Sequence, residues 1–524
     1  MKKKTTTIGL VFLIPFASLL AASDVRVVEA VKNQDRAAAS ALLKQHADVN
    51  AAQDDGATAL HWAAHWDDAE MADLLIRAGA HANAADDLGV TPLAVACNSN
   101  NGAIVEKLLT AGANANAVTS TGESVLMTCA RTGNADGVKA LLAHGAEVNA
   151  REKLRDQTAL MWAVSQRHPA VVRLLLEHGA DVHARTRVSH QLVIRDVEGA
   201  RFVCPPDVTE ESRRKSTYKI EAIAGSREIP KVVCNMADMA AKGGSTPLLF
   251  AARVGDVESA KLLLAAGAKA NDAGPDGNSA LVVAAYSGQR ELATLLLDKD
   301  ARPNAADGGY AALHVAILRG DLELVKALLS HGADPNIRLT KGTPVLRDNV
   351  DLHLSGVLAG ATPFFLAAKF VEVEIMRALT AGGADPLMGS NDGTSPLMAA
   401  AGVGWKVAAY TRRDNATPGS IPPPADDDRA LEAVKLALDL GADVNASNEA
   451  GDTALHGAAN AGYAEVIQLL AAKGANLNAK NRAGRTPLDM VKVDLEGTKG
   501  RHEVKSAEAA LLKLGARDEA AGSK

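Results

Sequence analysis

The chain has 524 residues, of which 47% are hydrophobic but only 3% are aromatic. Single hydrophobic cores stop growing at about 250–300 residues, so this length excludes one compact domain and favours many small helices built from Ala and Leu. The formal charge of −6 argues against nucleic-acid binding, because that function needs a surplus of Lys and Arg to neutralise phosphates.

The first 23 residues differ from the rest of the chain. Lys2, Lys3 and Lys4 precede an apolar stretch from Ile8 to Leu20, and small side chains follow at Ala21-Ala22-Ser23. This order is typical of a secretory signal peptide, and the apolar stretch is shorter than the roughly 20 residues that span a bilayer. We expect residues 1–23 to be a cleaved signal of bacterial type, with an uncleaved anchor as the alternative. The mature protein is then periplasmic or secreted, without a membrane-spanning helix.

A short motif recurs along the rest of the chain. Thr58-Ala59-Leu60-His61 returns in variant form at ten later positions, which are Thr91, Ser124, Thr158, Thr246, Ser279, Ala311, Thr362, Ser395, Thr453 and Thr486. The interval is 33 residues in five of these steps, as from Thr58 to Thr91 and from Thr91 to Ser124. Each copy continues with a Leu pair such as Leu74-Leu75, then with Gly79-Ala80 and Asn83 or their equivalents.

The motif predicts two short helices in each copy. Thr58 can cap the first helix by accepting a backbone N–H, and Leu60, Ala63 and Ala64 then share one helical face. A second helix over about residues 70–78 presents the Leu pair, and Gly79 ends it because glycine tolerates the left-handed conformation. One such pair cannot bury its apolar face alone, so we expect the copies to stack.

This pattern resembles the ankyrin repeat, whose signature is T-P-L-H-x-A at a 33-residue period. The resemblance implies an all-α solenoid of about twelve helix-turn-helix units, including a degenerate first unit with helices over about 25–32 and 36–45. It also implies that His61, His314 and His456 tie adjacent turns together by hydrogen bonds. First helices and turns would line a concave surface that binds a partner protein.

Three intervals between motifs are too long, and they set the expected domain boundaries. We expect N-terminal repeats over 24–186, an insertion over 187–242, central repeats over 243–337 and a second insertion over 338–360. C-terminal repeats follow over 361–516, with a loop insertion at about 402–428, and residues 517–524 form a tail.

The insertion over 187–242 carries a small β pattern and two cysteines. Gln191–Ile194 and Arg201–Val203 flank Glu198-Gly199 as one candidate hairpin, and a second candidate surrounds Gly225-Ser226. Cys204 and Cys234 are a candidate disulfide in an oxidising compartment, with two unpaired thiols as the alternative. By contrast, we expect Cys97 and Cys129, which fall in first helices, to be reduced and buried.

Catalytic patterns do not appear in the sequence. There is no Gly-rich phosphate loop, G-x-S-x-G elbow or C-x-x-C motif. His61 and His65 lie four residues apart on one predicted helix, but no third metal ligand accompanies them. We therefore expect no catalytic residue, cofactor or metal.

The residue four positions after the Thr of each motif varies and is expected to point towards the concave surface. The aromatic residues Trp62, Trp162 and Phe250 fall there and are candidate anchors for a partner. The alternative is that these rings fill space between neighbouring helices. Acidic turn tips add further candidate contacts at Asp54, Asp55, Asp86 and Asp87.

The expected function is a monomeric protein-binding scaffold of the cell envelope, with a protein partner of unknown identity and no catalysis. Two alternatives remain open from the sequence. One is an enzyme whose site lies on the 187–242 insertion, and the other is an exported effector that binds proteins of another organism.

Overall fold

The computed structural model describes residues 24–99, 102–192, 239–342, 354, 358–404, 427–492 and 501–517. The predicted signal peptide and the candidate pair Cys204 and Cys234 lie outside these residues. The chain divides into two compact units, residues 1–147 and 148–524, called here the N-terminal unit and the C-terminal unit. Within the described ranges, no helix has the length and apolar character needed to cross a membrane.

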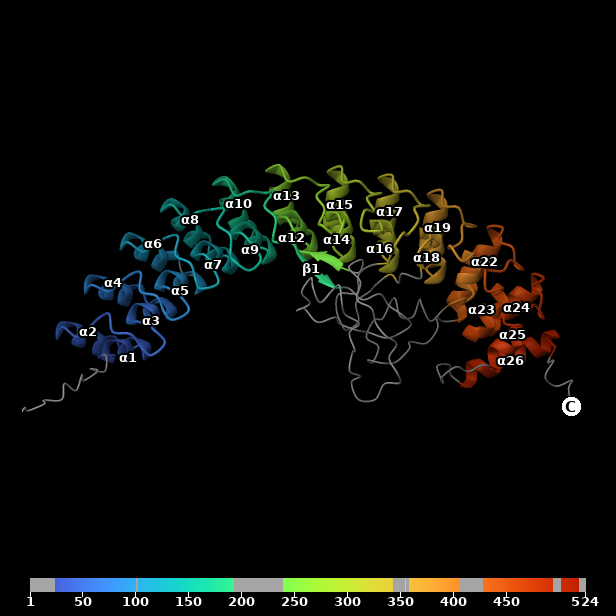
Figure 1. Cartoon of the computed structure of the whole chain (residues 1–524), viewed down its shortest axis with the longest axis horizontal. Helices are drawn as coiled ribbons and strands as arrows, with labels where there is room; N and C mark the ends of the chain where they lie inside the picture. Colours follow the sequence, from blue (N-terminus) through green and yellow to red (C-terminus); the bar gives the residue numbers. More distant parts are fainter. Residues whose placement is uncertain are drawn as a thin grey trace, which may run out of the picture. The chain divides into compact units, whose positions relative to one another are not determined.

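The described residues of the N-terminal unit form four helix pairs (Figure 1). These pairs are α1 (Arg26–Lys32) with α2 (Arg36–Lys44), α3 (Ala59–His65) with α4 (Ala69–Arg77), α5 (Pro92–Asn98) with α6 (Gly102–Thr110), and α7 (Val125–Thr132) with α8 (Ala135–Ala143). The degenerate first repeat predicted from the sequence is therefore confirmed, since α1 and α2 fall within one residue of the expected bounds.

The C-terminal unit continues the pattern with eight helix pairs in its described residues. They are α9 (Ala159–Ser165) with α10 (Pro169–Glu177), α12 (Pro247–Val254) with α13 (Val257–Ala265), α14 (Ala280–Tyr286) with α15 (Arg290–Asp298), α16 (Ala312–Leu318) with α17 (Leu322–Ser330), α18 (Pro363–Lys369) with α19 (Val373–Ala381), α20 (Pro396–Ala400) with α22 (Asp427–Asp439), α23 (Ala454–Ala461) with α24 (Ala464–Ala472), and α25 (Pro487–Lys492) with α26 (Arg501–Leu514). The predicted all-α repeat fold of about twelve units is confirmed.

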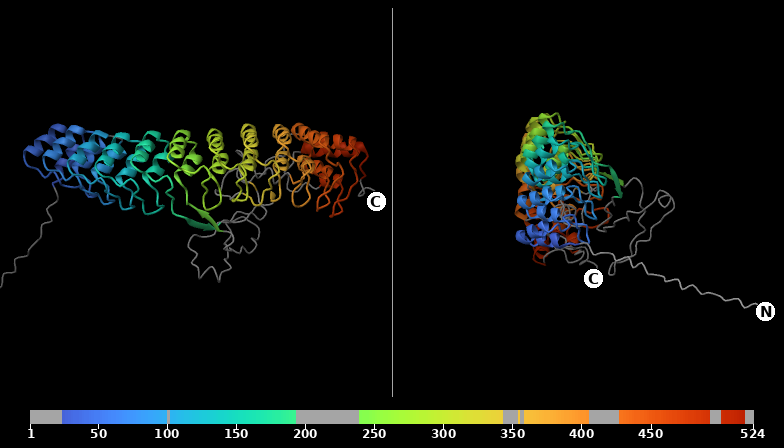
Figure 2. Two further views of the ribbon diagram at one scale, coloured as in Figure 1. Left: turned by 90° about the horizontal axis from the view of Figure 1, so that it is seen from above. Right: turned by 90° about the vertical axis from the view of Figure 1, so that its left-hand side faces the viewer.

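Within each unit the helices form two rows. First helices pack on first helices, as α3 does on α1 and α5, and second helices pack on second helices, as α13 does on α10 and α15. In Figure 2 the turns of each unit leave the helices on one side. Buried Ala residues such as Ala63 and Ala96 let the first helices approach closely, and one or both residues of each Leu pair, such as Leu75 and Leu108, are buried. The expected stacking of apolar faces is thus confirmed within each unit.

The motif residues supply the helix caps. Ser124, for example, accepts a hydrogen bond from the backbone N–H of Met127, as expected for an N-cap. Thr58 differs, because its own N–H donates to Nδ1 of His61 at 3.1 Å and its hydroxyl also contacts that nitrogen. Gly79 follows α4 with φ of 91°, which L-residues with a Cβ rarely adopt.

The histidines of the motif tie neighbouring turns together, as the resemblance implied. His61 Nε2 lies 3.0 Å from the carbonyl oxygen of Val90, His314 Nε2 lies 3.0 Å from that of Ile337, and the equivalent distance from His456 to Arg485 is 3.1 Å. In each case Nδ1 accepts a backbone N–H, so Nε2 must carry the proton that it donates to the carbonyl. This pairing requires the neutral imidazole.

At the end of eight repeats of the described chain, an asparagine forms a second link to the following repeat. Its Nδ2 donates to a backbone carbonyl at 2.9–3.2 Å and its Oδ1 accepts a backbone N–H at 2.7–2.8 Å. We call this two-bond link the asparagine clamp. It occurs at Asn50, Asn83 and Asn116 in the N-terminal unit and at Asn149, Asn271, Asn304, Asn336 and Asn445 in the C-terminal unit.

A short antiparallel ladder closes the base of the first insertion. Strand β1 (Ser189–Leu192) pairs with β2 (Met239–Lys242), so that Ser189 faces Lys242 and Leu192 faces Met239. The ladder joins the two ends of the insertion. The second arm of the predicted hairpin, Arg201–Val203, and the candidate hairpin around Gly225-Ser226 lie outside the described residues.

Cationic side chains hold the described ends of all three insertions. Arg185 Nη1 donates to the carbonyls of Gly244 and Ala273 at 2.9 Å each, and Arg338 Nη1 donates to the matching carbonyls of Gly360 and Gly389 at 2.7 and 3.1 Å. At the third insertion, Lys369 Nζ donates to Val403 and Gly404, 2.8 and 3.1 Å away. Burial lowers the pKa of Lys369 to about 8. These three residues therefore act as anchors for the extra sequence.

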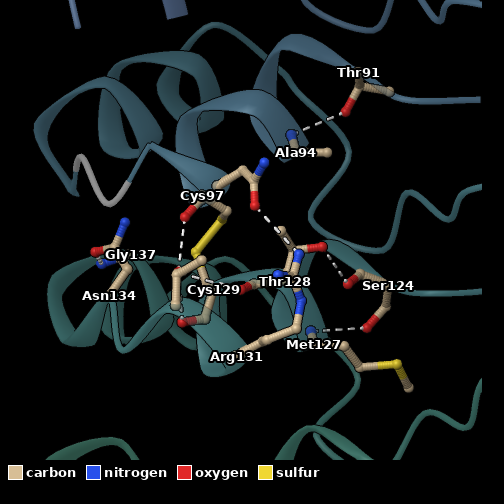
Figure 3. Close-up of a disulfide and its surroundings, with 12 residues drawn as sticks. Thr91, Ala94, Cys97, Ser124, Met127, Thr128, Cys129, Arg131, Asn134 and Gly137 are labelled. Carbon is tan, nitrogen blue, oxygen red and sulfur yellow. Dashed lines mark hydrogen bonds between the residues drawn. A yellow bond between two sulfur atoms is a disulfide. The ribbon is translucent and has the colours of Figure 1, made fainter. Parts of the chain in front are cut away.

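Cys97 and Cys129 form a disulfide between α5 and α7, which corrects the expectation that both are reduced (Figure 3). Their burial was predicted correctly, since both side chains are fully buried. The repeat explains the pairing: Cys97 lies six residues after Thr91 and Cys129 five residues after Ser124, on adjacent first helices whose Cα atoms approach to 4.6 Å here. That separation lies within the usual range for a disulfide.

A pH titration tests the neutral state of His314. Burial lowers its pKa from 6.5 to about 4, so below pH 6.5 the unfolded chain binds a proton that the folded chain does not. The contribution of neutral His314 to the free energy of unfolding is therefore complete above pH 6.5. It is lost as the pH falls towards 4, by about 3 kcal/mol at most. Denaturation of wild type and His314→Gln should show a stability difference that shrinks over this range. A difference that stays constant with pH would contradict the assignment.

Reduction tests the disulfide. Closing a loop of 32 residues contributes about 4 kcal/mol in the chain-entropy description. A reductant should therefore lower the urea midpoint of the wild-type N-terminal unit but leave the Cys97→Ala/Cys129→Ala variant unchanged. Alkylation of unfolded, unreduced protein followed by mass spectrometry provides the control, because modification of Cys97 and Cys129 under those conditions would rule out the bond.

Candidate protein-binding surface

The positions predicted to face a partner are half-buried in part of the chain and buried in the rest. Trp62, Val95, Trp162, Phe250 and Val283 are half-buried. The equivalent residue of α7, Thr128, is buried, and so are those from the α16 repeat to the α23 repeat, which are Val315, Leu366, Ala399 and Gly457. The three aromatic candidates therefore lie among the accessible positions of this series.

Trp62 lies in a polar and aromatic network that links α1 with α3. Its Nε1 donates to Oε1 of Gln53 at 2.8 Å, and Nε2 of Gln53 donates to Glu29 at 2.7 Å. The ammonium group of Lys32 lies 5.1 Å from the centroid of the Trp62 ring, within cation–π range. These contacts fix the indole in one orientation, so a partner would meet a preorganised ring.

Two residues that the sequence analysis did not select extend this network. Trp66 stacks on Trp62 with ring centroids 6.3 Å apart, and its Nε1 donates to the carbonyl of Lys32. His65 packs edge-on against both rings, at 5.6 Å from Trp62 and 4.7 Å from Trp66. The spacing of 62, 65 and 66, on or directly after α3, was the available signal, since residues three and four apart are neighbours on a helix surface.

Trp162 and Phe250 belong to the C-terminal unit, on the packed neighbours α9 and α12. The indole Nε1 of Trp162 is buried without a hydrogen-bond partner in the structure, in contrast to that of Trp62. Phe250 lies 5.9 Å from the guanidinium carbon of Arg253. Trp62 is in the N-terminal unit, so the three candidate anchors fall in two separate units.

The acidic turn tips divide into two kinds. Asp55 accepts the N–H of Ala57, and Asp86 accepts those of Leu88 and Val90, so these carboxylates stabilise their own turns. Asp54 and Asp87 are exposed. The backbone N–H of Asp87 also donates to the carbonyl of Asp55, which joins the two turns directly.

A shallow cavity of about 420 Å³ lies where α1, α2, α3 and α4 meet. It is lined by residues that include Val31, Gln34, Arg36, Trp66, Asp68 and Glu70. Arg36 bridges the two carboxylates, at 2.8 Å from Asp68 and in direct contact with Glu70. The cavity therefore combines an exposed indole with charged groups.

In the part of the chain that the structure describes, no group of three or more His, Cys, Asp or Glu side chains is placed to hold a metal ion. His61 and His65, which are four residues apart, have separate surroundings, since His61 bonds to the next turn while His65 packs on Trp66.

Two curated proteins are similar to parts of this chain. E3 ubiquitin-protein ligase KEG of Arabidopsis thaliana is 27% identical over 262 residues, which are 49% of this chain and 14% of that protein. The nuclear factor NF-kappa-B p105 subunit of Gallus gallus is 30% identical over 179 residues, or 33% of this chain and 16% of that protein. The chain thus spans about one seventh of the length of these relatives.

The family described as "Ankyrin repeats (3 copies)" matches at residues 27–119, 96–186, 220–307, 248–338 and 425–493. These overlapping matches cover more than half of the chain and coincide with the helix pairs of both units. The chain therefore belongs to the ankyrin-repeat family, whose repeats serve as protein–protein interaction scaffolds.

Proposed function

We propose that this chain is an exported, monomeric, non-catalytic scaffold of the bacterial cell envelope that binds a partner protein. In each unit the binding face would be formed by the first helices and turns of its repeats, with Trp62 as the anchor in the N-terminal unit and Trp162 and Phe250 as the anchors in the C-terminal unit. The observation that carries the proposal is the series of half-buried aromatic rings at one motif position, on helices that neighbouring repeats hold rigidly.

Rigid aromatic anchors suit protein binding. Tyr and Trp side chains dominate the binding energy of many interfaces because they bury a large area at little entropic cost. Trp62 is already fixed by Gln53 and stacked on Trp66. Its side chain therefore loses little conformational entropy when a partner binds. The two relatives have names that describe different activities, and each is similar to this chain over only a small part of its length. A region shared by proteins of different activity is more consistent with binding than with one common reaction.

Export rests on two independent observations. The N-terminal Lys residues and the following apolar stretch have the order of a secretory signal. The Cys97–Cys129 bond suits an oxidising compartment, since disulfides are rare in reducing cytosol.

Affinity capture tests the binding face. Mature protein used as bait in an envelope extract should retain a specific partner, and Trp62→Ala/Trp162→Ala should reduce its recovery at least about tenfold, because a hot-spot truncation costs about 2 kcal/mol or more. Leu154→Ala and Leu387→Ala provide the matched control, because both side chains are exposed and apolar but lie outside the aromatic series. Circular dichroism must show an intact helix content for every variant.

Undiminished capture by the double tryptophan variant would contradict the proposed face. Loss of an enzymatic activity on deletion of residues 187–242 would instead favour the catalytic alternative. Recovery of the protein from the culture medium, rather than from the envelope fraction, would favour the exported effector.

A further inference from the structure

The negative charge of the chain is concentrated in the N-terminal unit. Residues 24–147 contain 16 Asp and Glu residues against 8 Lys and Arg residues, whereas residues 148–524 contain 46 against 45. Nearly all of the excess acid in the folded repeats therefore belongs to four of the twelve helix pairs. Such a local surplus raises the concentration of cationic partners near that unit.

Internal ion pairs leave a specific set of carboxylates available. Arg26, Lys32, Arg36, Lys107 and Arg131 already pair with acidic side chains inside the N-terminal unit. Among the described residues, five aspartates around α3 take part in no ion pair, and these are Asp54, Asp55, Asp67, Asp86 and Asp87. The unbalanced charge thus lies beside the aromatic network.

Carboxylates flank the aromatic rings of α3 on both sides in the sequence. Asp54 and Asp55 lie just before this helix, Trp62, His65 and Trp66 lie on or directly after it, and Asp67 follows. We call these six residues, together with Asp87 of the next turn, whose N–H donates to the carbonyl of Asp55, the α3 surface. A seven-residue helix is about 10 Å long, which equals the length of an extended peptide of about three residues.

The α3 surface already binds a cation of its own chain. Lys32 lies over the Trp62 ring, while Trp66, stacked on that ring, remains 41% exposed. Beside Trp66, the cavity described above contains the ion pairs of Arg36 with Asp68 and Glu70. The unit therefore uses the same two interactions, a cation on an indole and a guanidinium on carboxylates, that a basic ligand would use.

From this arrangement we infer that the α3 surface binds an arginine-containing basic segment of a partner protein. A guanidinium is planar, so it stacks on the exposed face of Trp66 and can donate to Asp67 at the same time. Further basic residues of the segment meet Asp54 and Asp87, which are exposed at the turn tips. The inference rests on the proposed protein-binding function and specifies the chemistry of the partner.

Peptide binding to the full chain tests this inference. Fluorescence anisotropy with labelled nona-arginine should show binding that weakens as salt rises, tighter than binding of nona-lysine, and no binding of nona-glutamate. Trp66→Ala should weaken nona-arginine binding about tenfold, while Leu88→Ala, which removes another exposed apolar side chain of the same unit, should leave it unchanged.

A charge-matched pair of triple variants separates the local surface from general electrostatics. Asp54→Asn/Asp67→Asn/Asp87→Asn should weaken binding at least tenfold. Asp307→Asn/Glu177→Gln/Glu449→Gln removes the same charge from exposed positions of the C-terminal unit and should change binding less than twofold. Equal losses in the two triple variants, or full affinity in Trp66→Ala, would overturn the inference.

The two proposals fail in distinguishable ways. If nona-arginine does not bind but the envelope partner is captured through the aromatic series, the scaffold function stands and the basic partner is wrong. If nona-arginine binds the α3 surface but the tryptophan variants leave capture unchanged, the proposed face is wrong and the site for basic segments stands.

Discussion

The asparagine clamp is the interaction on which the rest of the structure depends. One amide side chain satisfies both a carbonyl and an N–H of the following repeat, as Asn304 does with Gly332 and Asp334. A pair of short helices cannot bury its own apolar face, so each repeat is stable only when its neighbours are held in register. The clamp and the motif histidine provide that register through polar groups, while the Leu pairs and Ala faces provide the buried area.

This division of tasks explains how the chain accommodates insertions. Across the second insertion Asn336 reaches Gly383 and Asp385 with the same geometry as an uninterrupted clamp, although 47 to 49 residues intervene. Across the first insertion the clamp position is occupied by His183, and Arg185 bridges to Gly244 and Ala273 instead. The links between repeats are therefore kept by side chains at the repeat ends, which frees the turns to carry extra sequence.

The residues that stabilise the stack of repeats differ from those that are available to bind a partner. Residues that hold repeats together are those that contact backbone groups of a neighbour, and they recur at the 33-residue period. Two kinds of residue remain available for a partner. Trp62 and Phe250 occupy a position of the repeat whose side chain varies from copy to copy, and Trp66 lies outside the repeated motif. A solenoid can thus change its surface without changing its core, and function resides in the surface.

Much of the fold could be predicted from the sequence because the relevant signals are local and periodic. The cap at Ser124, the left-handed Gly79 and the degenerate repeat of α1 and α2 depend on neighbouring residues only. The Cys97–Cys129 bond was not predicted because Cys97 is the sixth residue after its motif Thr, whereas Cys129 is the fifth after its motif Ser. The 33-residue period therefore does not place the two cysteines at equivalent positions. Arg185, Arg338 and Lys369 were missed because their partners follow an insertion, and Trp66 was missed because it falls just beyond the end of its helix.

Hydrogen exchange after removal of a single clamp tests the central claim most directly. Asn304→Ala deletes both bonds to the next repeat, whereas Asn33→Ala removes an exposed asparagine that follows α1 and forms no clamp. Exchange followed by mass spectrometry should show faster exchange in Asn304→Ala around residues 332–334 and in the α16 and α17 repeat, with no change in Asn33→Ala. Unchanged exchange in both variants would contradict the view that these amides hold the repeats in register.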